Sequence, residues 1–131
     1  MTVGVVTGEV LHVSPRAVAT EWFSGLVGNE RGSGVVIPVA AVEWIEGGLS
    51  SSPPSSAPAL SATFADVLAD IARRSASVTI RTRRSDFAGC VVRVGDGYVD
   101  AVGSHSTHST PSRRFSTASI VAVFQGAATW G

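Results

Sequence analysis

Arginines crowd the second half of this chain and are its clearest candidates for chemistry. A guanidinium can bind phosphate bidentately, and aromatic rings between such arginines can stack on bases. If nucleic acid binds, we expect its phosphates at Arg83, Arg84, Arg93, Arg113 and Arg114, with Tyr98 as a stacking ring. The alternative is a solvated face whose arginines pair with nearby aspartates, and the zero net charge of the chain favours it.

Other chemistries find little support in the residue types. His105 and His108 form an H-x-x-H pair in a Ser/Thr-rich run that predicts a loop, and no third metal ligand is evident. Cys90 is the only cysteine, so no disulfide can form within the chain, and nothing places a histidine base beside it. We therefore expect no catalytic residue, no metal and no cofactor, and we predict that the protein is not an enzyme.

Charge is unevenly spread although it sums to zero. Residues 1–62 carry two Arg against five Glu, and residues 63–131 carry eight Arg against five Asp, so the two parts have net charges of −3 and +3. The sequence contains no apolar run of the ~18 residues that a membrane span needs. It begins with no basic, signal-like segment. We expect a soluble, cytoplasmic protein without a membrane partner or a small-molecule substrate.

The second half predicts one helix followed by short antiparallel strands. Phe64, Val67, Leu68 and Ile71 recur with helical spacing within residues 63–74, and Thr63 can cap that helix with Asp66 as its partner. Gly95-Asp96-Gly97 is a strong hairpin signal. Alternating apolar residues predict strands at 77–83, 90–94, 98–102, 113–116 and 119–124.

The first half repeats part of this pattern. Residues 8–19 align with 89–100 at an offset of 81, which places Gly8 on Gly89, and residues 35–48 align with 113–126 at an offset of 78. We expect a turn at Ser14-Pro15-Arg16, a strand at 17–23 and a Gly-rich loop at 24–34. The predicted organisation is a truncated β-rich repeat (1–48), a Ser/Pro-rich linker (49–62), a complete domain (63–126) and a tail (127–131).

Residues 63–126 resemble an Sm-like (LSm or Hfq-like) domain. The resemblance implies a mainly β fold, a bent five-stranded antiparallel small barrel with one N-terminal helix. Asp100 stands where RNA-binding Sm proteins carry Asn, and Ser116-Thr117 stands where they carry Arg-Gly, so the family's RNA site does not carry over. The family-motif positions are Gly89, Gly97, Asp100 and Ile120.

Two functions remain open from the sequence. The first is a non-catalytic Sm-like assembly or binding module that binds RNA weakly and without sequence preference. The second is an oligomeric scaffold, or protein-interaction module, with no nucleic-acid role. Small barrels leave open strand edges that must be paired or covered, so both functions predict a homo-oligomer joined through strand edges.

Overall fold

The fold is mainly β, as the sequence predicts. The computed structural model describes residues 1–28, 33–47, 62–103 and 112–125, which form one ten-stranded antiparallel sheet in the order β5-β1-β2-β3-β4-β10-β6-β7-β8-β9. The sheet does not close on itself. The elements are β1 (Thr2–Val5), β2 (Val10–Val18), β3 (Trp22–Val27), β4 (Ser33–Pro38), η1 (Val39–Ala41), β5 (Val42–Glu46), α2 (Phe64–Arg73), β6 (Ser77–Thr82), β7 (Asp86–Gly95), β8 (Tyr98–Gly103), β9 (Ser112–Ser116), η2 (Thr117–Ser119) and β10 (Ile120–Gln125).

The helix α2 begins at the predicted cap. The Thr63 hydroxyl accepts the backbone N–H of Asp66 at 3.1 Å, and the Asp66 carboxylate accepts the backbone N–H of Thr63 at 2.9 Å. This reciprocal capping box satisfies two donors that a helix start would otherwise leave unpaired. Phe64, Leu68 and Ile71 are buried on one face, and α2 packs against β7. The helix and its apolar face are therefore confirmed.

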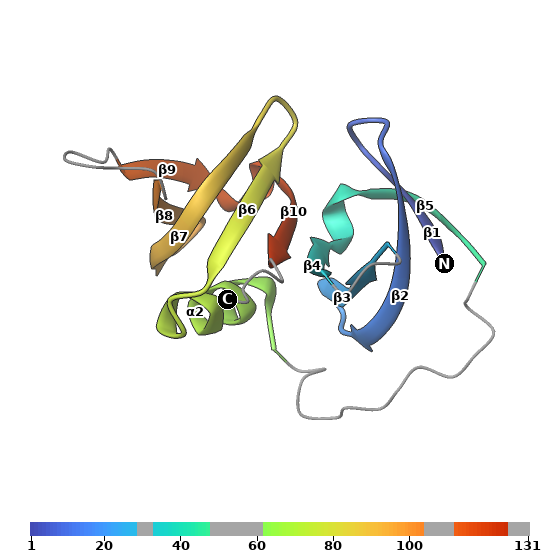
Figure 1. The fold of residues 1–131 in the computed structure, drawn as a ribbon, viewed down its shortest axis with the longest axis horizontal. Helices are drawn as coiled ribbons and strands as arrows, with labels where there is room; N and C mark the ends of the chain where they lie inside the picture. The colour runs from blue at the N-terminus through green and yellow to red at the C-terminus, as the bar shows by residue number, and fades with distance from the viewer. Residues whose placement is uncertain (29–32, 48–61, 104–111, 126–131) are drawn as a thin grey trace.

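The two halves of the sheet have the same strand order. The first half runs β5-β1-β2-β3-β4 and the second β10-β6-β7-β8-β9, and a short 3₁₀ helix precedes the last strand of each. Antiparallel pairing of β4 with β10 joins the halves, with Val36 opposite Val123 and Val35 opposite Phe124. Figure 1 places β4 and β10 side by side at the middle, and β9 and β5 at opposite ends.

The predicted alignment of Gly8 with Gly89 is wrong. Gly8 lies in the turn between β1 and β2 with φ +93°, whereas Gly89 lies inside β7 and pairs with Gly103. The β-bulges show which residues of the two halves correspond. The register shifts between Pro15 and Ala17 in β2 and between Val91 and Arg93 in β7, so these two bulges occupy the same place in the two halves. That correspondence is an offset of 76 (91 − 15). Regular Val alternation lets a sequence match slip along a strand, and only pairing fixes the register.

The predicted turn at residues 14–16 is also wrong. Strand β2 continues through these residues, and the chain reverses at residues 19–21. Pro15 is tolerated inside a strand because it lies at a bulge, where the ladder is already interrupted. Strand β3 then occupies much of the predicted Gly-rich loop. Gly25 is part of β3, and a larger residue does not fit at this position, because a Cβ there would come within 2.3 Å of the Ser14 carbonyl oxygen.

Two apolar clusters form the core, and strands β4 and β10 contribute to both. One cluster joins α2 and the second half to Trp22 and Val36, and the other joins the first half to Val121 and Ala122. The Trp22 indole N–H donates to the Ala62 carbonyl oxygen at 2.9 Å, which ties the first half to the start of the helix segment. Each half therefore completes the other's core.

Some predictions fall wholly or largely outside the described residues. These are the linker at 49–62, the tail at 127–131, and the loop with His105 and His108. Within the described residues, no helix is long and apolar enough to cross a bilayer.

Candidate functional site

The outer face of β7, β8 and β9 carries a row of alternating charges. Arg93, Asp100 and Arg114 lie opposite one another on these three strands, and cross-strand partners share a face. The Arg114 guanidinium donates to both carboxylate oxygens of Asp100, from Nε at 2.8 Å and from Nη2 at 3.1 Å. This hydrogen bonding, together with the positive charges of Arg114 and Arg93, lowers the pKa of Asp100.

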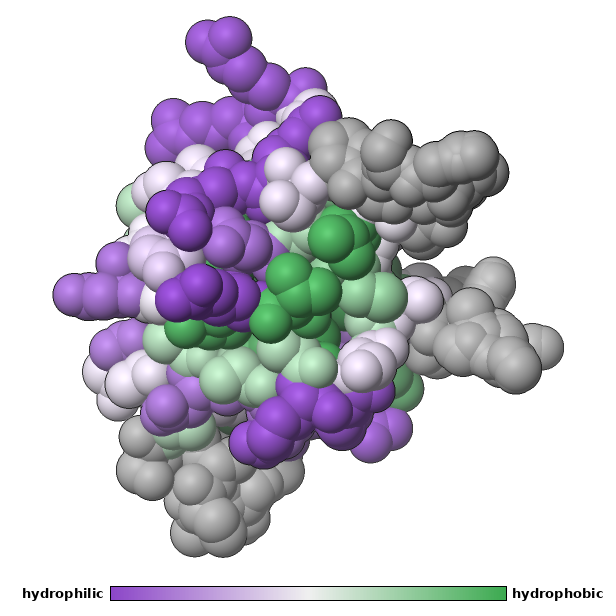
Figure 2. Space-filling model, turned by 90° about the vertical axis from the view of Figure 1, so that its left-hand side faces the viewer, coloured by the Kyte–Doolittle hydropathy of each residue, from purple (hydrophilic) through white to green (hydrophobic). Residues whose placement is uncertain are grey.

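Tyr98 lies beneath the same guanidinium. The Arg114 Cζ atom is 3.9 Å from the centre of the Tyr98 ring, a cation–π contact. One face of the predicted stacking ring is therefore already covered by a side chain of its own protein. Figure 2 shows the face of the molecule that lies at the left of Figure 1, where mostly hydrophilic side chains surround a small apolar area.

Arg113 and Arg114 are neighbours on β9, but their side chains lie on opposite faces of the sheet. Successive side chains of a strand point to opposite faces, and Arg113 lies over the Phe87 ring with its Cζ atom 4.9 Å from the ring centre. Phe87 in turn meets Phe115 edge to face at 5.4 Å. Among the described residues Arg113 has no acidic partner, whereas Arg114 is held by Asp100. Arg113 is the arginine of β9 that is free to pair elsewhere.

Arg83 and Arg84 form a separate group. They lie in the turn between β6 and β7, beside a shallow cleft of about 400 Å³ that Glu9, Arg81 and Asp86 also line. Arg93 is near the far end of β7, so about seven residues of strand, roughly 23 Å, separate the two groups. The structure therefore brings Arg93, Arg114 and Tyr98 together and leaves Arg83 and Arg84 apart.

Of the four family-motif positions, Asp100 lies in the charged row described above, and the other three have structural uses. A Cβ on Gly89 would come within 2.0 Å of the Val102 carbonyl oxygen, so β7 and β8 approach too closely there for any side chain. Gly97 adopts φ +87° in the predicted hairpin turn. Ile120 is buried. Close approach of the strands, rather than a ligand, accounts for Gly89.

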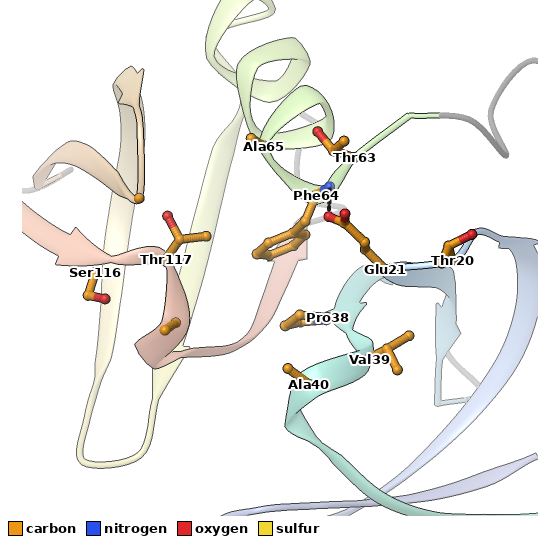
Figure 3. A pocket seen from close by; sticks show the side chains of 12 residues that line it. Thr20, Glu21, Pro38, Val39, Ala40, Thr63, Phe64, Ala65, Ser116 and Thr117 are labelled. Carbon is orange, nitrogen blue, oxygen red and sulfur yellow. Dashed lines mark hydrogen bonds between the residues drawn. The ribbon is translucent and has the colours of Figure 1, made fainter.

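A pocket of about 800 Å³ opens where the halves meet (Figure 3). The first half contributes Glu21 and Pro38–Ala40, α2 contributes Phe64, and the second half contributes Ser116–Ala118. The Phe64 ring points into the pocket, and its backbone N–H donates to Glu21 Oε1 at 3.4 Å. No pattern in the sequence indicates this pocket, because its walls come from distant segments, one of them the start of α2, that only the folded chain brings together.

Metal-ligating side chains do not gather in the described part of the chain. No cluster of three or more His, Cys, Asp or Glu side chains there can hold a metal ion. Cys90 is half-buried on β7 as a free thiol.

Comparisons with known proteins identify no relative. No family model, no curated protein and no solved structure matches this chain.

Proposed function

We propose that this protein is a non-catalytic assembly module built from an Sm-like barrel in residues 63–126 and an internal repeat of it in residues 1–48. The observation that carries the proposal is the β4–β10 junction. Two five-stranded units of the same strand order meet there edge to edge within one chain. A unit that associates in this way once has the surfaces to do so again.

The ends of the sheet support further association. Strands β5 and β9 each have a partner on one side only among the described residues. They lie at opposite ends of the molecule, so one chain cannot pair its own β5 with its own β9 (Figure 1). An unpaired edge presents free backbone N–H and C=O groups, and a second chain can satisfy them.

Weak, sequence-independent RNA binding is the second candidate function. Arg83 and Arg84 favour it, because both are exposed and neither has an ion pair among the described residues. The engagement of Arg114 with Asp100 and Tyr98 favours the scaffold without a nucleic-acid role. The arginines therefore offer few free phosphate contacts.

Sedimentation velocity and light scattering across the micromolar range test the assembly proposal. We expect a mass that is a multiple of 13.4 kDa and that falls on dilution. A stable monomer throughout that range, in a sample whose circular dichroism shows a folded β protein, overturns the proposal. Titration of the same sample with mixed-sequence RNA at low salt separates the two functions, since the scaffold predicts no binding.

A further inference from the structure

We propose that a second copy of this chain docks its β5 against β9 in the register of the internal β4–β10 junction, so that Glu46 of one chain pairs with Arg113 of the next. This inference rests on the proposed assembly function and adds the two edges, their direction and the residues that recognise each other.

The register follows from the positions of the strands. β9 pairs with β8 in the second half as β4 pairs with β3 in the first, with Phe115 in the place of Ile37. β5 pairs with β1 as β10 pairs with β6, with Ile45 in the place of Val123. Both correspondences are an offset of 78 (115 − 37 and 123 − 45).

The internal junction can be transferred to the free edges with this offset. Its pairs are Val35 with Phe124 and Val36 with Val123. At the outer edges the corresponding pairs are Arg113 with Glu46 and Arg114 with Ile45. The internal pair of Val35 and Phe124 is thus replaced at the outer edges by the oppositely charged Arg113 and Glu46. A charged residue keeps each edge solvated until a partner binds. The aliphatic stem of Arg114 can cover Ile45.

Charge selects the direction of association. β9 carries Arg113 and Arg114, and β5 carries Glu43 and Glu46. Pairing β9 with β9, or β5 with β5, brings like charges together across the strands, whereas pairing β9 with β5 brings opposite charges together. The edges are therefore complementary head to tail and not self-complementary.

The residues concerned are available. Glu46 and Arg113 are exposed, and neither has an ion pair among the described residues. Trp44 and Ile45 are 42% and 36% exposed on β5, while their counterparts Ala122 and Val123 are fully buried at the internal junction. The edge that waits for a partner thus exposes the positions that the internal junction buries.

Head-to-tail contacts repeat from chain to chain. An open row of chains always leaves one β5 and one β9 unpaired at its ends, and closing the row into a ring removes both. We therefore expect a discrete oligomer and not a broad series of masses.

Charge reversal tests the pairing. Glu46→Arg and Arg113→Glu should each raise the dissociation constant of association about tenfold, because each replaces an attraction with a repulsion at every junction. An equimolar mixture of the two variants should associate again, since the arginine introduced at position 46 of one chain then meets the glutamate introduced at position 113 of the other. The double variant should associate by itself.

Glu43→Arg is the matched control, because it changes the same charge on the same strand at a position that the register places opposite Ser116. It should weaken association clearly less than Glu46→Arg does. Equal effects of the two variants, or an oligomer indifferent to all of them, overturn the pairing and leave edge assembly standing. A wild-type monomer overturns both. Thermal unfolding of each variant confirms that it is folded.

Discussion

Arg81 on β6 donates from Nη1 to Oε2 of Glu9 at 2.6 Å, so a side chain of the second half holds the β1–β2 turn of the first. The same guanidinium donates to both oxygens of Asp86 at 2.8 and 3.0 Å and lies 4.6 Å from the centre of the Phe124 ring. Its hydrogen bond with Asp86 raises the pKa of Arg81 and lowers the pKa of Asp86. One arginine thus links both halves beside their junction.

Replacing Arg81 with Ala should lower the free energy of unfolding by about 1–2 kcal/mol, because it removes hydrogen bonds to two carboxylates and the contact with Phe124. Urea denaturation followed by tryptophan fluorescence measures this. Arg83→Ala is the matched control. Arg83 lies in the turn after β6 and has no ion pair among the described residues, so its replacement should change the free energy of unfolding by less than about 0.5 kcal/mol. Equal losses in the two variants would contradict the role of Arg81 as a link.

Stability should fall in acid because of Asp86 and Asp100. Their pKa values are lowered in the folded protein, by hydrogen bonds from Arg81 and Arg114 respectively. A carboxyl group with a lowered folded pKa stabilises the protein fully above its unfolded value of about 3.9, and this contribution is lost as the pH falls through the folded pKa. The midpoint of chemical denaturation, measured at a series of pH values from 7 to below the folded pKa values of both groups, tests this.

The variants Asp86→Asn and Asp100→Asn should each have a shallower acid profile than the wild type. Arg81→Ala should resemble Asp86→Asn, since it removes the main cause of the lowered pKa. Profiles parallel to that of the wild type would show that these carboxylates do not drive the acid response.

Gly89→Ala should be strongly destabilising, by about 3 kcal/mol or more, because a Cβ would lie 2.0 Å from the Val102 carbonyl oxygen and both strands are fixed by pairing. Gly97→Ala is the comparison. It strains a turn residue with φ +87° but meets no atom within 4 Å, so its cost should be nearer 1 kcal/mol. Thermal unfolding of both variants ranks them, and a milder loss for Gly89→Ala would contradict the close approach.

Local signals predicted the elements that depend on neighbouring residues. Thr63 and Asp66 identified the helix start, and Asp96-Gly97 identified the hairpin between β7 and β8. Pairing of distant strands could not be predicted in the same way. Pro15 suggested a turn, but the bulge that accommodates it depends on the register of β2 against β3. The apolar alternation of both halves supports several registers until the core selects one.

In the candidate site, too, the features that depend on neighbouring residues could be predicted from the sequence, and those that depend on strand register could not. Alternation along β9 is enough to predict that Arg113 and Arg114 point to opposite faces, although the cluster suggested a joint role. The row of Arg93, Asp100 and Arg114 required the registers of three strands. The contact of Arg81 with Glu9 joins residues 72 positions apart, and no spacing in the sequence indicates it.

RNA binding, if it occurs, should be limited by Asp100. This carboxylate holds Arg114 with two hydrogen bonds and repels phosphate. Asp100→Asn removes the negative charge and loosens Arg114, so binding of mixed-sequence single-stranded RNA at low salt should tighten severalfold.

Replacing both Arg83 and Arg84 with Ala should instead reduce the slope of log affinity against log salt by about 1.4, the loss of two phosphate contacts. Filter binding across a salt series measures both effects, and Ser85→Ala in the same turn is the control for the slope. Absence of binding by the wild type and by Asp100→Asn alike, at the lowest salt, would exclude the RNA function and leave assembly through β5 and β9 as the role of this fold.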